Sequence, residues 1–266
     1  MKIVNKSVCL WILMATLTTI AAVARASLDD ASKSHLDTLQ KTPDAAGTLI
    51  YRGVVFAQSA GSAEPLFKYE RRVTSAGTLM TAAHITQDAT GAVIIAETAQ
   101  LTPGYGLKRF DAVNRQAGYS GSVLVSDDGR HLDFSFTENG KTTTVREEVS
   151  ASLVTGPSLH GFILNSWDAL SSGKKLSVRM IVLAKMETYG FDIRRERQDG
   201  GITLFSVTPS SLLVRLAVKP MTVTFDTVSK NVVRYEGRVP PMEVVGEKLR
   251  QLDARVDYTS VAPSYR

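Results

Sequence analysis

Cysteine is almost absent from this sequence. Cys9 is the only one among 266 residues, and it lies inside an N-terminal apolar run. Without that run the chain has no thiol, which excludes thiol catalysis, disulfide exchange and zinc–thiolate sites. A chain of about 240 residues buries enough apolar surface to fold without disulfides, even in an oxidising compartment.

A hydrophobic run long enough to cross a bilayer is also missing. Residues 8–23 form an apolar run of about 16 residues, whereas a spanning helix needs roughly 20. Lys2 and Lys6 flank its start, and Ala24-Arg25-Ala26 follows it. This pattern is typical of a cleavable secretory signal peptide. We therefore expect a signal peptide over residues 1–26 instead of a retained anchor, and a periplasmic mature protein that begins at Ser27.

The chain lacks a strong excess of charge of either sign. Lys2, Lys6 and Arg25 supply three of the formal net charge of +5, which leaves +2 for the mature form. Acidic and basic residues are interspersed along the rest of the chain, so no nucleic-acid partner is expected.

Histidine is scarce, and no catalytic signature accompanies it. The four histidines belong to no metal-spaced pair, and a structural or surface role explains each: His35, His84, His131 and His160. Gly118–Ser122 resembles a nucleophile elbow but lacks the second glycine in register, so we expect the start of a strand there. Asp127-Asp128 and Glu147-Glu148 are interpreted as solvated charge. We predict no catalytic residues, no metal and no cofactor.

Turn signals, in contrast, are abundant. Asp-Gly and Asn-Gly between strand-like runs are strong hairpin signals, because both residues tolerate the positive φ of tight turns. The signals are Asp88-Ala89-Thr90-Gly91, Asp127-Asp128-Gly129, Glu138-Asn139-Gly140, Gln198-Asp199-Gly200-Gly201 and Ser229-Lys230-Asn231. They predict an antiparallel meander.

Two of the intervening runs alternate with period two. In His131–Thr137, Leu132, Phe134 and Phe136 share one face, as expected for a half-buried strand. Leu176–Glu187 is apolar on much of both faces, which predicts one long central strand.

Three segments have the spacing of helices instead. Pro157–Gly173 predicts an amphipathic helix with Ser158 as N-cap and Gly173 as stop. Met242–Leu252 also shows a helical apolar face, and a short helix is expected over Ala31–Leu39.

A sheet of about ten strands rarely stays open and flat. We therefore predict a mainly β fold, an antiparallel meander curled into an open half-barrel with one or two packed helices. The expected organisation is residues 1–26 as signal peptide, 27–46 as an N-terminal segment, 47–260 as a single β-rich domain and 261–266 as a tail.

Several motifs carry a resemblance to a known family. They are Phe67-Lys68-Tyr69-Glu70-Arg71-Arg72, Ala83-His84-Ile85-Thr86-Gln87-Asp88, Gly156-Pro157 before Trp167-Asp168, Val223-Thr224-Phe225-Asp226 and Arg234-Tyr235-Glu236-Gly237. The succession resembles uncharacterised periplasmic proteins that are similar to lipoprotein-carrier half-barrels, which shuttle acylated cargo to the outer membrane. The resemblance implies a concave apolar face that holds acyl chains, and it transfers no individual ligand residue.

Large flexible side chains are the candidates for an apolar ligand site. Met80, Phe162, Trp167, Met180 and Met186 are predicted to face inward, where they line a cavity or simply interlock as a filled core. The helix around Trp167 is correspondingly a movable lid or a permanent plug.

Two basic clusters are candidates for contact with anionic headgroups or a protein partner. They are Lys68, Arg71 and Arg72, and a second cluster of Arg194, Arg195 and Arg197, of which Arg194 and Arg195 are the contact candidates. The alternative is a sheet edge that charge protects from aggregation.

Three functions follow. The first is a periplasmic binder or carrier of a lipid or other apolar ligand in envelope biogenesis, with peripheral membrane contact. The second is an assembly or interaction factor that has a filled core and binds an envelope protein partner. The third is a hydrolase with an unrecognised site, which a cluster of His84, His131 or His160 with an acid and a serine would indicate.

Overall fold

The described chain forms one open sheet in this computed structural model, which covers residues 47–58 and 64–262. Its 15 strands follow the order β8-β7-β6-β5-β4-β3-β2-β1-β15-β14-β13-β12-β11-β10-β9. The strands are β1 (Thr48–Ala57), β2 (Phe67–Ala76), β3 (Leu79–Gln87), β4 (Val93–Leu101), β5 (Leu107–Asn114), β6 (Tyr119–Val125), β7 (His131–Glu138), β8 (Lys141–Glu148), β9 (Ser152–Val154), β10 (Leu176–Val182), β11 (Glu187–Asp199), β12 (Ile202–Pro209), β13 (Met221–Asp226), β14 (Val232–Val245) and β15 (Lys248–Ser260).

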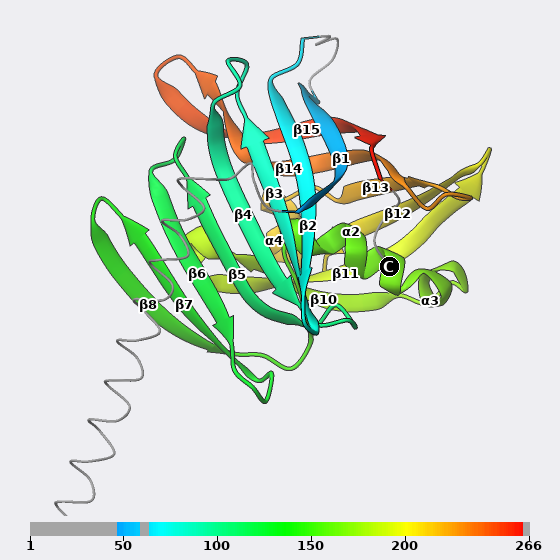
Figure 1. Ribbon diagram of the computed structural model, residues 1–266, viewed down its shortest axis with the longest axis horizontal. Helices are drawn as coiled ribbons and strands as arrows, with labels where there is room; N and C mark the ends of the chain where they lie inside the picture. Colours follow the sequence, from blue (N-terminus) through cyan, green and yellow to red (C-terminus); the bar gives the residue numbers. More distant parts are fainter. Residues whose placement is uncertain (1–46, 59–63, 263–266) are drawn as a thin grey trace, which may run out of the picture.

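The sheet curls so that its two halves face each other. Strands β2 to β5 cross in front of β10 and β11, with helix between the two layers (Figure 1). The halves are joined in the middle by antiparallel pairing of β1 with β15. β8 and β9 remain at the two ends of the strand order, so the sheet does not close. The predicted class, an open antiparallel half-barrel with few helices, is confirmed.

The predicted turns join neighbouring strands. Each of the five signals lies in a connection between consecutive antiparallel strands. At the β7–β8 turn, Asn139 and Gly140 have φ angles of 51° and 73°. Positive φ at both central residues is what a two-residue turn requires when it must match the twist of its strands. Tyr119 begins β6, as expected for the Gly118–Ser122 segment.

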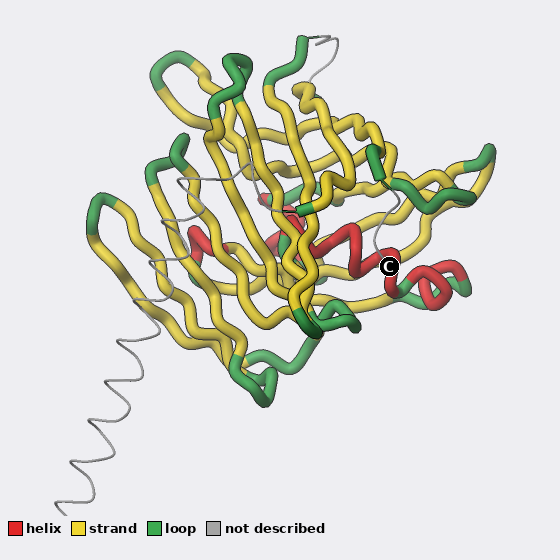
Figure 2. The backbone as a smooth tube through the Cα atoms, in the orientation of Figure 1, coloured by secondary structure: helices red, strands yellow, loops and turns green. Residues whose placement is uncertain are grey.

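Two helices supply the single parallel connection of the sheet. β9 and β10 pair in parallel, and parallel neighbours need a crossover. The crossover consists of α2 (Gly156–Asn165) and α3 (Trp167–Ser171). In Figure 2, α2 lies within the curl of the strands and α3 lies at its right-hand end. The predicted helical segment is confirmed, but it is two helices. Thr155 is the N-cap in place of Ser158, whose Oγ accepts a hydrogen bond from the Thr155 N–H at 2.8 Å.

The helix predicted over Met242–Leu252 is wrong. The segment is a β14–β15 hairpin in which Val245 pairs with Lys248 across Gly246-Glu247. Gly246 has a φ of 64°, and glycine at the first central position is the signature of a tight hairpin turn. The side chain of Gln116 secures this hairpin by accepting from the Met242 N–H at 2.8 Å and donating to its carbonyl at 2.9 Å.

The single long strand predicted over Leu176–Glu187 is also wrong. β10 ends at Val182, a 3-10 turn covers Leu183–Lys185, and Met186 has a left-handed φ of 51° before β11 begins. The alternation continues through this tight connection, so the pattern alone does not reveal it. β10 is the last strand but one in the sheet, not a central one.

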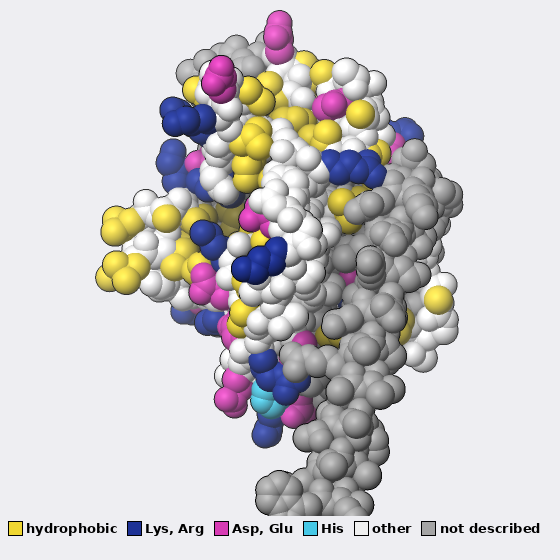
Figure 3. Space-filling model, turned by 90° about the vertical axis from the view of Figure 1, so that its left-hand side faces the viewer, with side chains coloured by type: hydrophobic (Ala, Val, Ile, Leu, Met, Phe, Trp, Pro, Cys, Tyr) yellow, Lys and Arg dark blue, Asp and Glu magenta, His cyan; other side chains and the backbone are white. Residues whose placement is uncertain are grey.

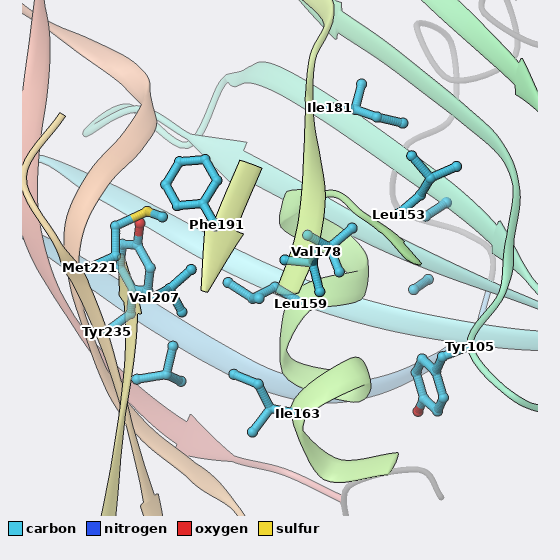
Figure 4. Packing of buried hydrophobic residues seen from close by; sticks show 14 of the residues in the cluster. Tyr105, Leu153, Leu159, Ile163, Val178, Ile181, Phe191, Val207, Met221 and Tyr235 are labelled. Atoms are coloured by element: carbon cyan, nitrogen blue, oxygen red, sulfur yellow. The ribbon is translucent and has the colours of Figure 1, made fainter. Parts of the chain in front are cut away.

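The hydrophobic core fills much of the space around the two helices. Leu159 and Ile163 lie on the side of α2 that points toward Val207 and Met221, and Tyr105 lies on the other side (Figure 4). Next to them, Trp167 packs edge-on against Phe205 and Phe225, with ring centroids 5.2 and 5.6 Å apart.

Some predictions concern residues outside the described part. The signal peptide over 1–26, the segment 27–46 with its Ala31–Leu39 helix, and most of the 261–266 tail lie outside the described residues. Within residues 47–58 and 64–262, no helix is long and apolar enough to span a bilayer.

Candidate functional site

A cavity of about 640 Å³ lies between the two halves of the sheet. Side chains from both halves and from α2 line it. Phe110 on β5, Leu159 on α2 and Phe191 on β11 belong to its apolar part. At its other side the lining is polar, with His84 and Glu97 from β3 and β4.

The polar side of the cavity is produced by strand register. Tyr51 on β1 pairs with Arg71 on β2, Arg71 with His84 on β3, and His84 with Glu97 on β4. Residues paired across neighbouring strands point to the same face of a sheet. The register therefore places four polar side chains side by side on the concave face; we call Tyr51, Arg71, His84 and Glu97 the polar row.

The Tyr51 hydroxyl connects two histidines. It lies 2.9 Å from His84 Nε2 and 2.8 Å from His160 Nδ1. Burial, aided by the positive charge of Arg71, lowers the pKa of His84 well below its ordinary value and that of His160 to about 3. Both rings are therefore neutral at physiological pH. Because one hydroxyl has a single proton to donate, one ring must donate to the Tyr51 oxygen while the other accepts from it.

Arg71 is buried beneath α2. Its side chain is 5% exposed, it donates to the carbonyl oxygen of Pro157, and its guanidinium lies 6.0 Å from the centre of the Tyr51 ring. It anchors the start of α2 to the sheet. The prediction that Arg71 contacts a headgroup or partner at the surface is therefore wrong, because its strand position faces the helix.

The remaining basic candidates lie on interior strands. β2 pairs with β1 and β3, and β11 pairs with β10 and β12, so neither cluster protects a sheet edge. Lys68 and Arg194 are exposed, whereas Arg72 and Arg195 are half-buried. Arg72 and Arg194 form ion pairs with Glu70 and Glu196 at 3.1 and 2.8 Å.

Glu97 is the acid of the cavity. Burial raises its pKa from 4.5 to about 7, and no ion pair joins it to any described cation. Its charge acts on the hydroxyls of Tyr69 and Tyr119, which lie on neighbouring parts of the cavity wall. The Tyr69 hydroxyl is itself buried without a hydrogen bond of normal geometry within the described chain.

Of the five apolar candidates, only Met180 lines the cavity. Met80, Phe162 and Met186 are half-buried and pack against the core elsewhere. Trp167, the first residue of α3, is 8% exposed and packs into the core. Sequence reasoning did not identify Tyr51, Tyr69 or Glu97 as site residues.

The cluster predicted for a hydrolase is only partly assembled, because His84 and His160 share the cavity with the acid Glu97 but His131 does not join them. The ring centroids of His84 and His160 are 6.3 Å apart. His131 lies elsewhere, at the β6–β7 turn, where its Nδ1 is 3.9 Å from Asp128 Oδ1. No described serine hydrogen-bonds to either cavity histidine, and no group of described His, Cys, Asp and Glu side chains has the arrangement of a metal site.

The expectation of purely solvated charge fails for Glu147. This carboxylate accepts hydrogen bonds from the Thr188 N–H at 2.8 Å and from Arg179 at 2.9 Å. It thereby links the β8 end to the β10–β11 hairpin, which a sequence pattern of adjacent acids does not disclose.

Tyr51→Phe is expected to lower the free energy of unfolding by about 1–3 kcal/mol, because it leaves buried histidine nitrogens without a partner. Tyr69→Phe is the matched control, since it removes a buried hydroxyl that has no such bond, and its effect should be close to zero. Urea denaturation of both variants measures the difference. Equal losses would show that the Tyr51 hydroxyl does not hold the two rings.

Comparisons with known proteins do not identify a family for this chain. No protein-family model and no curated protein matches the chain. Among solved structures, an acyl-CoA thioesterase II from Mycobacterium marinum is similar at 13% identity over 88% of both chains, with a TM-score of 0.14. That score is too low to indicate a shared fold.

Proposed function

We propose that this protein is a periplasmic binding or carrier protein for a lipid or other apolar ligand in envelope biogenesis. The cavity between the two halves of the sheet carries this proposal. Its volume of about 640 Å³ lies in the range of roughly 300–1,000 Å³ that is usual for small-molecule sites. Its walls are mostly aliphatic and aromatic, with a few polar groups at one side. A filled core, as the interaction-factor alternative requires, would leave no such space.

A short helix connects the cavity with the outer surface. α4 (Leu212–Ala217) contributes Leu213 and Ala217 to the cavity wall. The helix has no buried residue, and Leu212, Leu213 and Leu216 are exposed at 75%, 78% and 87%. In Figure 3, hydrophobic side chains gather on a projection at the left, at the height that α4 has in Figure 1.

The segment that contains α4 carries basic but no acidic residues, and the acid that acts on Arg215 is Asp192 of β11. Residues 200–225 contain Arg215 and Lys219 but no acidic residue. Exposed leucines beside basic side chains favour binding at the interface of an anionic bilayer. We therefore propose that the protein contacts a membrane peripherally through α4, next to the cavity.

Blocking the cavity tests the binding function. Met180→Trp should weaken binding of a fluorescent fatty acid at least tenfold, because the larger side chain occupies the space that the ligand needs. Met80→Trp is the matched control: Met80 is also a half-buried strand methionine packed on the core, but it does not line the cavity. Fluorescence titration of the two variants and the wild type gives the affinities. Binding that survives Met180→Trp, or no binding by the wild type, would refute this proposal.

A further inference from the structure

Glu97, a half-buried acid of the cavity wall, has no ion-pair partner among the described cations. Glu97 lines the cavity on β4, yet no Lys, Arg or charged His forms an ion pair with it. Arg71, two positions away in the polar row, is directed to Pro157 and Tyr51 instead. Burying a carboxylate without a cation or a set of hydrogen bonds is costly, so natural proteins keep few such groups.

Aromatic side chains line the cavity wall near the same carboxyl group. Tyr69 and Tyr119 are close enough for its charge to raise their pKa values, and Phe110 lines the adjacent wall. Ring faces attract cations, and a desolvated cation beside an aromatic ring gains about 2 kcal/mol or more. A carboxylate between aromatic rings is the chemistry that recognises an ammonium group.

The cationic side chains of the cavity wall do not pair with Glu97. Arg238 lies on β14, and an ion pair with Asp253 at 2.6 Å neutralises it. Lys185 lies in the β10–β11 connection and is exposed. The acid therefore faces an apolar space in which a ligand can supply the missing positive charge.

We infer that Glu97 is the recognition site for a positively charged amine, held between Tyr69 and Tyr119, and that the ligand of this cavity is an amphipathic molecule with an ammonium head and an apolar tail. The inference rests on the proposed function, because it names the chemical class of the ligand in the same cavity. The tail would lie along Met180 and Phe191, on the apolar side.

Binding of such a head should depend on pH through Glu97. The carboxyl must lose its proton to pair with the cation, and its pKa of about 7 places this step in the physiological range. The other groups that face it keep one charge state between pH 5.5 and 8.5. They are neutral His84 from β3 and His160 from α2, and the neutral tyrosines Tyr51, Tyr69 and Tyr119.

The test compares three probes with the same ten-carbon chain: decyltrimethylammonium, decanol and decanoate. Calorimetric titration of the mature protein at pH 8 should show the ammonium probe binding at least tenfold more tightly than decanol. Because the ammonium probe keeps its charge at every pH, its affinity should fall roughly 30-fold from pH 8.5 to pH 5.5 as Glu97 takes up a proton.

Variants distinguish the contribution of the Glu97 carboxyl to binding from that of the apolar cavity. Glu97→Gln should remove the preference for ammonium and its pH dependence while leaving decanol binding intact. Glu70→Gln is the matched control, because Glu70 lies on the face of β2 opposite to Arg71. It should change neither the preference for ammonium nor its pH dependence. Equal binding of ammonium and decanol, or tighter binding of decanoate, would overturn the inference and leave the apolar-ligand function standing. Binding of none of the three probes would overturn both.

Discussion

Trp167→Ala should lower the free energy of unfolding by about 3–5 kcal/mol, the usual cost of deleting a large buried aromatic side chain. Trp167 packs edge-on against Phe205 and Phe225, and the Lys230 ammonium lies 5.1 Å from the centre of its ring. These contacts place the Trp167 side chain in the core, and we expect α3 to stay there. A movable lid would lose its packing in the open state, so the same change would cost far less.

The control for this experiment is a large side chain outside the core. Leu216→Ala removes a leucine that is 87% exposed on α4, and it should change stability by less than about 0.5 kcal/mol. Circular dichroism is the suitable probe, because Trp11 and Trp167 are the only tryptophans and the variant loses the second. A loss similar to that of the control would show that α3 opens.

Glu97→Gln should stabilise the protein increasingly as the pH rises. The carboxyl has a pKa of about 7 in the folded protein, against an ordinary value of 4.5. Between these values the folded protein holds a proton that the unfolded chain has released, so wild-type stability falls with rising pH across this window. At 1.36 kcal/mol for each pKa unit, the full effect is at most about 3 kcal/mol and is complete above pH 7.

Comparing Glu97→Gln with the wild type isolates the contribution of Glu97 to the pH dependence of stability. His84 and His160 have lowered pKa values and act on stability in the opposite sense, but they are present in both proteins. The advantage of the variant should grow by about 2–3 kcal/mol from pH 5 to pH 8.5 in urea denaturation. Glu138→Gln, at the exposed β7–β8 turn, should show no such growth. A constant difference would mean that Glu97 is not held in an apolar environment.

Local chemistry explains why the class of fold could be predicted. Turns such as Glu138-Asn139-Gly140 depend on two adjacent residues, and the strands between them depend on a period-two pattern. Met242–Leu252 shows the limit of this reasoning. Its apolar residues fit a helical face, and the single Gly246 that turns the chain back decides the outcome.

The site depends on pairings between strands, which no local pattern contains. His84 and Glu97 meet because β3 and β4 pair in one particular register, and His160 joins them from α2, far along the chain. One signal was nevertheless present. Glu97 is the only charged residue between Asp88 and Lys108, and a lone acid in an uncharged strand is a candidate for a buried functional group.

The pairing of β1 with β15 also has a consequence for how the chain reaches its fold. Nearly every other neighbour in the sheet follows directly along the chain, so most contacts close short loops, whereas this pair joins residues such as Val55 and Val256. Closing so long a loop carries the largest entropic penalty, which is expected to slow that step. A circular permutant that links residue 262 to residue 47 and begins between β8 and β9 would convert this distant pairing into one more local hairpin and should therefore fold faster.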